Sequence, residues 1–187
     1  GGQDHFYLEG QIAITIPQED NNFLIYSSTQ HPSETQQIIA KVLKQKFNSI
    51  SVKVRRIGGG FGGKESQSFL FAAITSIFSK KLNRPIKLRV DRDDDMIMTG
   101  KRHDFYYKYE VGFNNEGKIQ GLKVILASRC GISPDLSKAI NDRAIYHIDN
   151  AYFIPSIDLV SYRCKTNTVS NTAFRGFGGP QGMFCIE

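Results

Sequence analysis

The sequence predicts an α+β protein in which helices pack on one face of a mixed β-sheet. Stretches where apolar and polar residues alternate are interspersed with stretches where apolar residues recur every three to four positions. The two kinds of segment do not alternate strictly, as they would in a doubly wound parallel fold. The length of 187 residues suits one compact domain with its own core.

The first third of the chain predicts strands around one helix. In order, we expect strands over residues 12–16 and 23–27, a helix over 33–46 and a strand over 50–54. Residues 17–22, which begin with Pro17, form the turn between the first two strands. Ser33 and Gln36 have the spacing of a capping box, which predicts the start of the helix.

The rest of the chain predicts further helices, a loop and a hairpin. We expect a helix around 69–77, a strand over 86–90, an acidic surface loop over 91–100, strands over 105–113 and 118–127, a helix over 135–147 and a strand over 157–163. The run 69–77 is apolar almost all round, which indicates a buried helix. Residues 114–117 supply the hairpin turn.

Composition excludes several classes of protein. The net charge of +6 indicates a basic surface, an anionic ligand or an acidic partner. No block of five or six basic residues occurs, so we do not expect nucleic-acid binding. No apolar run approaches ~18 residues, so neither a membrane-spanning helix nor a membrane partner is expected. Cys130, Cys164 and Cys185 are odd in number and widely spaced, which favours buried thiols in a reducing, cytoplasmic compartment.

The two ends suggest a piece of a longer chain. The sequence begins with Gly1 rather than methionine, and it ends at Glu187 soon after a glycine-rich loop. We therefore expect residues 1–187 to be part of a domain that continues at both ends.

Two glycine-rich loops are the main functional signal. Residues 58–63 hold five glycines around a phenylalanine, and the string Gly-Phe-Gly-Gly recurs at 176–179. Glycine lets a backbone approach a ligand closely, although a tight structural turn remains an alternative. The first loop also has GxGxxG spacing, which leaves a dinucleotide site open with Asp91 as its ribose-binding acid. A nucleotide triphosphatase is not expected, because Glu65 stands where a hydroxyl would hold Mg²⁺.

Longer strings carry a resemblance to a known family. They cover residues 1–9, 28–30, 58–65, 91–96, 99–103 and 170–181. In this order, and over essentially the whole chain, they resemble the molybdopterin-binding part of the xanthine dehydrogenase and aldehyde oxidase family. Residues 9–11 and 30–34 are most similar to bacterial xanthine dehydrogenases with separate subunits.

The resemblance implies an activity and its cofactors. Family members of the xanthine type oxidise hypoxanthine and xanthine to urate with oxygen from water, at a molybdenum held by molybdopterin. Electrons leave through 2Fe-2S clusters and FAD to NAD, in other domains or a partner subunit of a dimeric enzyme. The catalytic base, a glutamate, lies beyond Glu187 together with much of the pterin pocket. The 187-residue chain is therefore expected to be inactive alone.

The resemblance also assigns roles to individual residues. Gln30, Phe61, Gly62 and Arg175 match cofactor-binding positions, and Gln30, Phe61 and Arg175 belong to the molybdenum environment without being side-chain ligands. Phe177 matches a residue that packs on the substrate ring. Read without the family, Gln30 is a loop residue, Arg175 a solvated arginine, and both phenylalanines are core residues.

Glu65 and Arg143 match the residues that contact opposite ends of a purine, and aldehyde oxidases usually have apolar residues there. Arg143 would stabilise negative charge on the ring, an effect of ~3 kcal/mol for one well-placed donor. Glu65 would orient the substrate and share a proton with a ring nitrogen. The alternatives are an acid at a helix N-terminus, favourable by ~0.5 kcal/mol, for Glu65, and an ion pair with Asp142 or Asp149 for Arg143.

Overall fold

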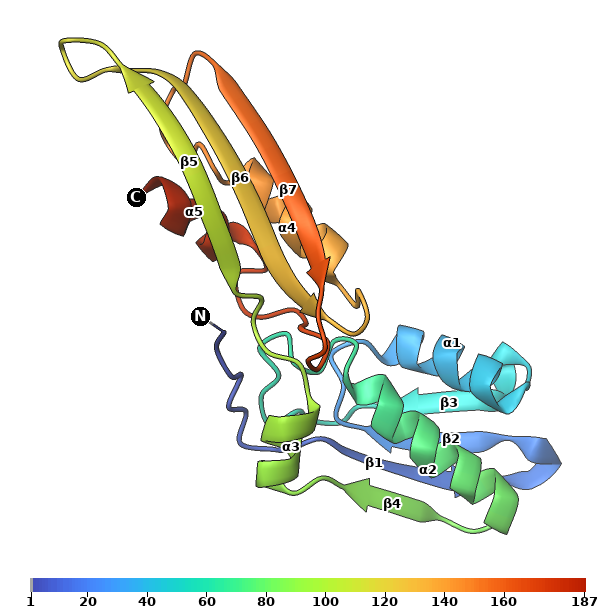
Figure 1. Ribbon diagram of the computed structural model, residues 1–187. Helices are drawn as coiled ribbons and strands as arrows, with labels where there is room; N and C mark the ends of the chain where they lie inside the picture. The colour runs from blue at the N-terminus through green and yellow to red at the C-terminus, as the bar shows by residue number, and fades with distance from the viewer. Residues whose placement is uncertain (1) are drawn as a thin grey trace. The chain divides into compact units, whose positions relative to one another are not determined.

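The computed structural model describes residues 2–187, so Gly1, which opens the first matching string, lies outside the described residues. The chain divides into two compact units (Figure 1). The first unit is His5–Thr99, and the second joins the N-terminal residues up to Asp4 to Gly100–Glu187. Each unit has its own sheet and its own apolar core.

The first unit is built on a four-stranded mixed sheet. Its strands are β1 (Ile12–Pro17), β2 (Phe23–Ser27), β3 (Ile50–Lys53) and β4 (Ile86–Arg89). Their order is β3-β2-β1-β4, with β1 antiparallel to both neighbours and β2 parallel to β3. Short 3-10 turns over Glu19–Asn21 and Phe47–Ser49 precede β2 and β3. All four strands lie within two residues of their predicted ranges.

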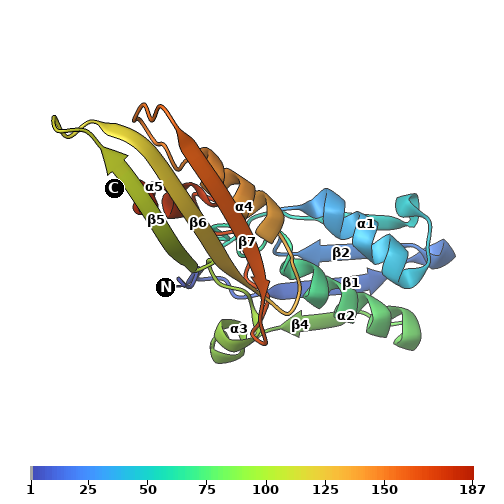
Figure 2. The same cartoon turned by 45° about the horizontal axis from the view of Figure 1, so that its top comes forward.

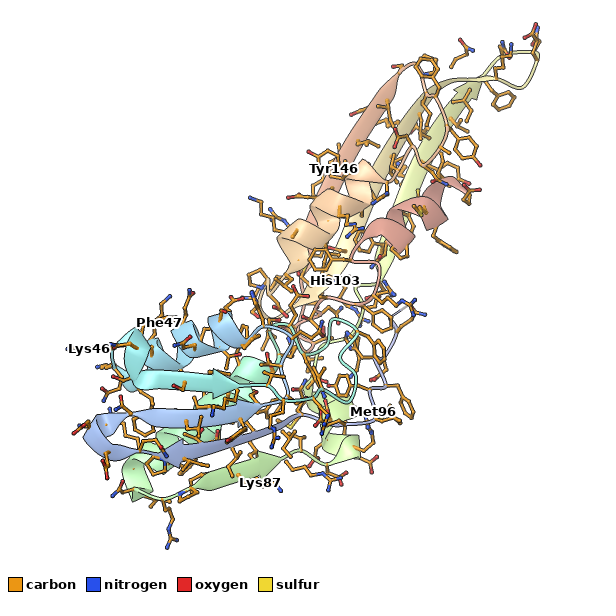
Figure 3. The ribbon with its side chains drawn as sticks, turned by 180° about the vertical axis from the view of Figure 1, so that it is seen from behind. Lys46, Phe47, Lys87, Met96, His103 and Tyr146 are labelled. Carbon is orange, nitrogen blue, oxygen red and sulfur yellow. The ribbon has the colours of Figure 1, made fainter. Side chains whose placement is uncertain are left out.

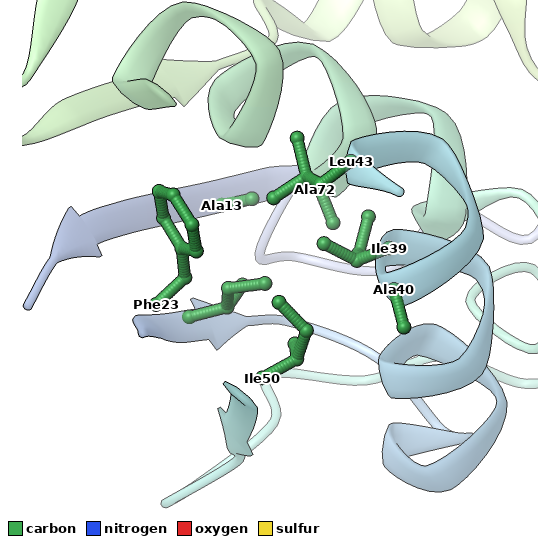
Figure 4. Packing of buried hydrophobic residues seen from close by; sticks show 8 residues of the cluster. Ala13, Phe23, Ile39, Ala40, Leu43, Ile50 and Ala72 are labelled. Carbon is green, nitrogen blue, oxygen red and sulfur yellow. The ribbon is translucent and has the colours of Figure 1, made fainter. Parts of the chain in front are cut away.

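Two helices, α1 (Pro32–Leu43) and α2 (Ser68–Leu82), pack on one face of this sheet. Ile39 and Leu43 of α1 meet Phe23, Ile50 and the neighbouring strand residues in a closed apolar cluster (Figure 4). The alternation of β1 and β2 sends every second side chain into this cluster and the others to the opposite face.

Two local predictions in this unit are wrong. The helix α1 begins at Pro32 after His31 and has no side-chain cap, so the predicted capping box of Ser33 is not used. A proline at the first helical position is already preorganised for the helix. The acidic stretch forms a helix, α3 (Arg92–Met98), instead of a loop. The Asp91 side chain caps it by accepting from the Asp93 backbone N–H at 3.0 Å.

Helix α2 is not buried all round, as its sequence had indicated. Leu70 and Phe78 are about half exposed. The buried face instead carries hydroxyl groups, because the Thr15 hydroxyl on β1 lies 2.9 Å from that of Thr75 and 3.0 Å from that of Ser76. Hydrogen-bonded hydroxyls thus occupy a position that the hydropathy pattern assigns to aliphatic side chains.

The second unit holds a three-stranded sheet. Strands β5 (Phe105–Phe113), β6 (Ile119–Gly131) and β7 (Ile157–Lys165) lie in that order, with β5 antiparallel and β7 parallel to β6. Helices α4 (Ser137–Tyr146) and α5 (Gly179–Ile186) flank one face of the sheet (Figure 2). The predicted hairpin and the helix α4 are confirmed, while α5 was not predicted from the sequence.

The α+β class is therefore confirmed, with two mixed sheets instead of one. The cysteines form no disulfide among the described residues, and Cys164 is exposed, contrary to the prediction of three buried thiols. No helix within residues 2–187 is long and apolar enough to cross a membrane.

Candidate functional site

The first glycine loop folds into a tight turn with unusual backbone angles. The Gly63 N–H donates to the Gly60 carbonyl at 2.8 Å, and the two residues between them have φ of 53° (Phe61) and 98° (Gly62). Positive φ at both central positions defines a type I′ turn. Phenylalanine rarely adopts this conformation, and such strain, of order 1–3 kcal/mol, concentrates at functional sites.

Polar side chains from elsewhere in the first unit hold this loop. The Gln30 amide oxygen accepts from the Gly62 N–H at 2.9 Å and from the Lys64 N–H at 3.3 Å. The Gln11 amide donates to the Gly63 carbonyl at 3.0 Å. Gln30 also packs directly on Gly60, where an added Cβ would lie 2.5 Å from its amide oxygen. The structure thus places Gln30 against the turn at Gly60 and Gly62, and its role at a cofactor stays a prediction.

A buried ion pair lies at the base of the same loop. The Lys64 side chain is 0% exposed, and its ammonium donates to the Glu9 carbonyl at 2.6 Å, to the Glu9 carboxylate at 3.2 Å and to the Ser28 hydroxyl at 2.7 Å. The Glu9 carboxylate also accepts from the Gly58 N–H at 2.9 Å. Glu9 and Lys64 therefore tie the two ends of the loop together.

This pair changes the titration of both of its members. Burial lowers the pKa of Lys64, although the neighbouring carboxylates of Glu9 and Asp95 oppose the shift. Partial burial would raise the pKa of Glu9, but the bonds it accepts from Ser28, Gly58 and Lys64 outweigh this effect and lower it.

A second buried network supports the loop from the other side. The Tyr7 hydroxyl donates to the Asp95 carboxylate at 2.7 Å, and the Gln11 backbone N–H donates to the same carboxylate at 2.9 Å. Burial, and then the bond to Asp95 and its charge, raise the pKa of Tyr7. The tyrosine ring also lies beneath the Lys64 ammonium, 4.6 Å from its centroid. Tyr7 therefore stays protonated and acts as a fixed support.

Three consecutive N–H groups of the loop lack a partner among the described residues, and Gly60, the middle residue, is buried beneath Gln30. Within residues 2–187, the backbone N–H groups of Gly59, Gly60 and Phe61 have no hydrogen-bond acceptor. The Phe61 side chain is 48% exposed. An array of such donors on bare backbone suits an anionic or oxo group. The residues present therefore fit the oxygen and phosphate groups of a molybdenum–molybdopterin cofactor.

The second glycine loop repeats the same turn in the second unit. The Gly179 N–H donates to the Gly176 carbonyl at 3.0 Å, with φ of 48° at Phe177 and 91° at Gly178. The Arg102 guanidinium lies 4.0 Å from the centre of the Phe174 ring and donates to the Arg175 carbonyl at 2.8 Å. Arg102 thus fixes the irregular segment that leads into the turn, while the Arg175 side chain is exposed.

Helix α4 packs directly against this second turn. A Cβ on Gly178 would lie 2.1 Å from the Ile140 carbonyl, so the turn and the helix backbone are in contact. Arg143 lies one turn further along α4, is exposed, and donates to the His147 ring at 3.4 Å. It forms no ion pair among the described residues, so neither Asp142 nor Asp149 neutralises it as the alternative had supposed.

The predicted site residues divide between the two units. Gln30, Phe61, Gly62 and Glu65 belong to the first unit, whereas Arg143, Arg175 and Phe177 belong to the second. Within the first unit, Glu65 is half-buried just after the turn, and its N–H donates to the Gly62 carbonyl at 3.3 Å. It precedes α2 by three residues, outside the helix. That Glu65 and Arg143 face each other across a substrate stays a prediction.

Sequence reasoning missed the residues that support the first loop. Glu9, Gln11, Lys64 and Asp95 lie in strings that carry the family resemblance, but neither the resemblance nor the residue pattern assigned them a supporting role. A lysine between glycines and a helix start gives no sign that it will be fully buried. Its Nζ is committed to Glu9 and Ser28, so it is not available to a nucleotide phosphate.

In the first unit, a glycine turn whose N–H donors lack partners among the described residues suits an anionic or oxo-bearing cofactor. A family model, the molybdopterin cofactor-binding domain, matches residues 1–187, and the chain therefore belongs to that family. It corresponds to part of the molybdopterin-binding region of the xanthine oxidase family.

Curated relatives match over the whole chain. Among them are a xanthine dehydrogenase from Calliphora vicina (46% identical over 187 residues), a xanthine dehydrogenase/oxidase from Mus musculus (50% over 188) and a nicotinate hydroxylase from Emericella nidulans (46% over 188). In each case the aligned region is 100% of this chain and 14% of the relative. The chain thus spans about one seventh of the length of these relatives.

Solved structures show the same fold. Aldehyde oxidoreductase from Desulfovibrio gigas matches with a TM-score of 0.91 and 24% identity, over 100% of this chain and 20% of that one. Carbon monoxide dehydrogenase from Oligotropha carboxidovorans matches with a TM-score of 0.86 and 22% identity, over 100% and 24% of the two chains. At these identities the likeness describes the fold alone.

Proposed function

We propose that this chain is part of a xanthine dehydrogenase, a molybdenum hydroxylase that oxidises hypoxanthine and xanthine to urate with oxygen from water. The proposal rests on Glu65 beside the turn of the first unit and, in the second unit, on Arg143 of α4, which forms no ion pair within residues 2–187. Several relatives that match the whole chain are named xanthine dehydrogenases, which supports the same substrate class. Because the chain spans 14% of such relatives, residues 1–187 would form part of a larger domain that continues on both sides.

The cofactor, when bound, supplies two-electron oxidation of a ring carbon by an oxygen that comes from water. The residues of this chain would hold the cofactor and orient the substrate. The open N–H groups of Gly59, Gly60 and Phe61, with Gln30 and Gly62, would bind the cofactor side of the site, and Arg175 would add positive charge from the second turn. Each of these groups sits on a backbone that hydrogen bonds hold in place, so little reorganisation is needed during reaction.

The substrate would be held by three side chains. Glu65 would accept from or share a proton with a purine nitrogen, and Phe177 would pack on the flat ring. Arg143 would pair with the negative charge that develops on the ring, a contribution of ~3 kcal/mol for one well-placed donor. The glutamate that acts as general base would come from a later segment of the longer protein.

The remaining steps would take place outside these residues. We propose that electrons pass through 2Fe-2S clusters and FAD to NAD, held in other domains or in a partner subunit, and that the parent enzyme is a cytoplasmic dimer. The unbridged cysteines are in keeping with a reducing compartment. The separate-subunit organisation of bacterial members stays a prediction.

Substitutions in the longer enzyme test the purine assignment. Glu65→Ala and Arg143→Met should each lower kcat/KM for xanthine by about 100-fold, as removal of one transition-state donor does elsewhere, and change turnover of a simple aldehyde far less. Lys138→Met, on the same helix α4 as Arg143, serves as the matched control. Equal losses on xanthine and aldehyde would contradict the purine assignment.

Two alternatives remain open to experiment. The 46% identity with a nicotinate hydroxylase favours a molybdenum hydroxylase acting on another N-heterocycle, and an aldehyde substrate belongs to the same class. A non-redox module that binds nucleotides through residues 58–63 is the other, although the burial of Lys64 speaks against it. Micromolar binding of NAD or ATP in equilibrium dialysis would favour that module.

A further inference from the structure

The face of the first sheet that α1 and α2 leave uncovered has a defined chemical character. The register of the strands places one cross-strand row on this face: Lys53, Tyr26, Ile14 and Lys87. The next pair is Ile12 opposite Arg89. Apolar side chains therefore occupy the central strands β1 and β2, and basic side chains occupy the edge strands β3 and β4.

A groove of about 180 Å³ runs across this face. Ile12, Ile14 and Tyr26 form its apolar floor, and Lys53, Arg55, Arg56 and Lys87 line its sides. Figure 3 shows Lys87 at the rim of the sheet, on β4. The three floor residues are half-buried, because neighbouring side chains cover only part of them.

The charge of this groove is not balanced by residues of the chain. None of Lys53, Arg55, Arg56, Lys87 and Arg89 forms an ion pair with any residue in the range 2–187. The one acid that lines the groove, Glu9, is already bonded to Ser28, Gly58 and Lys64. Five cations on and beside one sheet face, with no ion-pair partner among the described residues, repel one another, and carboxylates from outside the chain would relieve this repulsion.

We propose that this face is the docking site for an acidic segment of the longer protein, with apolar side chains between its carboxylates. The apolar floor suits a polypeptide, whose side chains can bury Ile12, Ile14 and Tyr26, better than it suits a polyphosphate backbone. The remaining 86% of the relatives' length supplies the candidate segments. The inference rests on the proposed function only in requiring that the chain is part of a longer protein.

Lysine labelling of the longer protein tests this assignment. Acetylation rates of single lysines are compared between the native protein and the same protein in denaturant. Lys53 and Lys87 should react about tenfold more slowly in the native protein, which corresponds to 1.4 kcal/mol of shielding. Lys64, which is fully buried, is the protected control, and Lys41 on the exposed side of α1 is the reactive control.

Carbodiimide cross-linking then identifies the occupant. Lys53 or Lys87 should become joined to an aspartate or glutamate outside residues 1–187, and the double variant Lys87→Glu with Arg89→Glu should restore fast acetylation of Lys53. Native Lys53 and Lys87 that react as fast as Lys41 would overturn the proposal. The lack of any cross-link to an outside carboxylate, or protection that disappears after nuclease treatment, would overturn it as well. None of these readouts depends on hydroxylase activity, so failure here is distinguishable from failure of the proposed function.

Discussion

Replacing Glu9 with glutamine isolates the electrostatics beneath the first glycine turn. Lys64 is fully buried, and breaking a buried ion pair by removing one partner costs about 3–5 kcal/mol, because the other charge is left uncompensated. The Glu9 side chain is 37% exposed, and the Glu9 carbonyl and Ser28 hydroxyl would still accept from Nζ. We therefore expect the lower end of the range, about 3 kcal/mol.

The reverse substitution should cost much less. Lys64→Met removes the buried charge itself and leaves Glu9 partly solvated, with its bonds from Ser28 and Gly58 intact. A shape-matched apolar replacement of this kind costs about 1 kcal/mol. In the double variant Glu9→Gln with Lys64→Met, no buried charge is left unpaired, so its free energy of unfolding should be no lower than that of Lys64→Met alone.

Urea unfolding followed by far-ultraviolet circular dichroism measures these differences. With a slope of about 2 kcal/mol per molar urea, Glu9→Gln should lower the midpoint by about 1.5 M. Glu34→Gln is the control, because that carboxylate pairs at the surface with His31 and should contribute less than about 1 kcal/mol. A Glu9→Gln effect no larger than the control, or additive losses in the double variant, would refute the reasoning.

Three further predictions concern other sites. Burial lowers the pKa of His103 to about 4, although nearby charges oppose the shift. Below pH ~6.5 the unfolded protein binds a proton at this imidazole and the folded protein does not, so the free energy of unfolding should fall by about 1.4 kcal/mol per pH unit from pH ~6.5 to 4. His103→Phe should abolish this pH dependence, measured by urea unfolding at a series of pH values. Gly178→Ala should lower the stability of the protein by more than ~2 kcal/mol in thermal melts, because the added Cβ would lie 2.1 Å from the Ile140 carbonyl at a residue with positive φ. Gly112→Ala is the control and should be neutral or stabilising, because the space around Gly112 is open. Phe61→Asn should raise the melting temperature by a few degrees, a gain of about 1 kcal/mol, because asparagine tolerates the left-handed backbone and about half of Phe61 is solvent-exposed. An unchanged or lower melting temperature would show that packing holds the ring in place.

The strands were predictable because their signal is local. Alternation in residues 50–54 and the turn over 114–117 depend on neighbours in the sequence, and the structure has β3 and the β5–β6 hairpin there. The acidic stretch was misread because its charge suggested a loop, whereas Asp91 caps a helix with acids in the first turn, which is favourable. The helix α2 was misread because hydropathy does not reveal that Thr15 pairs with hydroxyls on its buried face.

Less of the candidate site than of the fold could be predicted from the sequence. Glycine strings and the family resemblance pointed to the two turns, and the structure places Gln30 against the first of them. The support could not be foreseen, since Glu9, Gln11 and Asp95 lie far in the sequence from the loop that they hold. Each is an ordinary polar residue whose role depends on which backbone groups the fold leaves unpaired, and that information lies in the tertiary structure.

The repeated string Gly-Phe-Gly-Gly now has a physical explanation. In both units the phenylalanine and the following glycine take positive φ, and the flanking glycines close the same hydrogen bond. A type I′ turn strongly prefers asparagine, aspartate or glycine at the position that Phe61 and Phe177 occupy. A phenylalanine with positive φ occurs at the same turn position in two units that have different sheets and different supporting residues, so packing within one core does not account for it. At the first turn the half-exposed Phe61 lies beside backbone donors without a partner among the described residues, a geometry that suits an anionic cofactor, whereas at the second turn the Phe177 N–H already donates to the Phe174 carbonyl at 2.8 Å, so the two turns share a backbone shape but not the same donors.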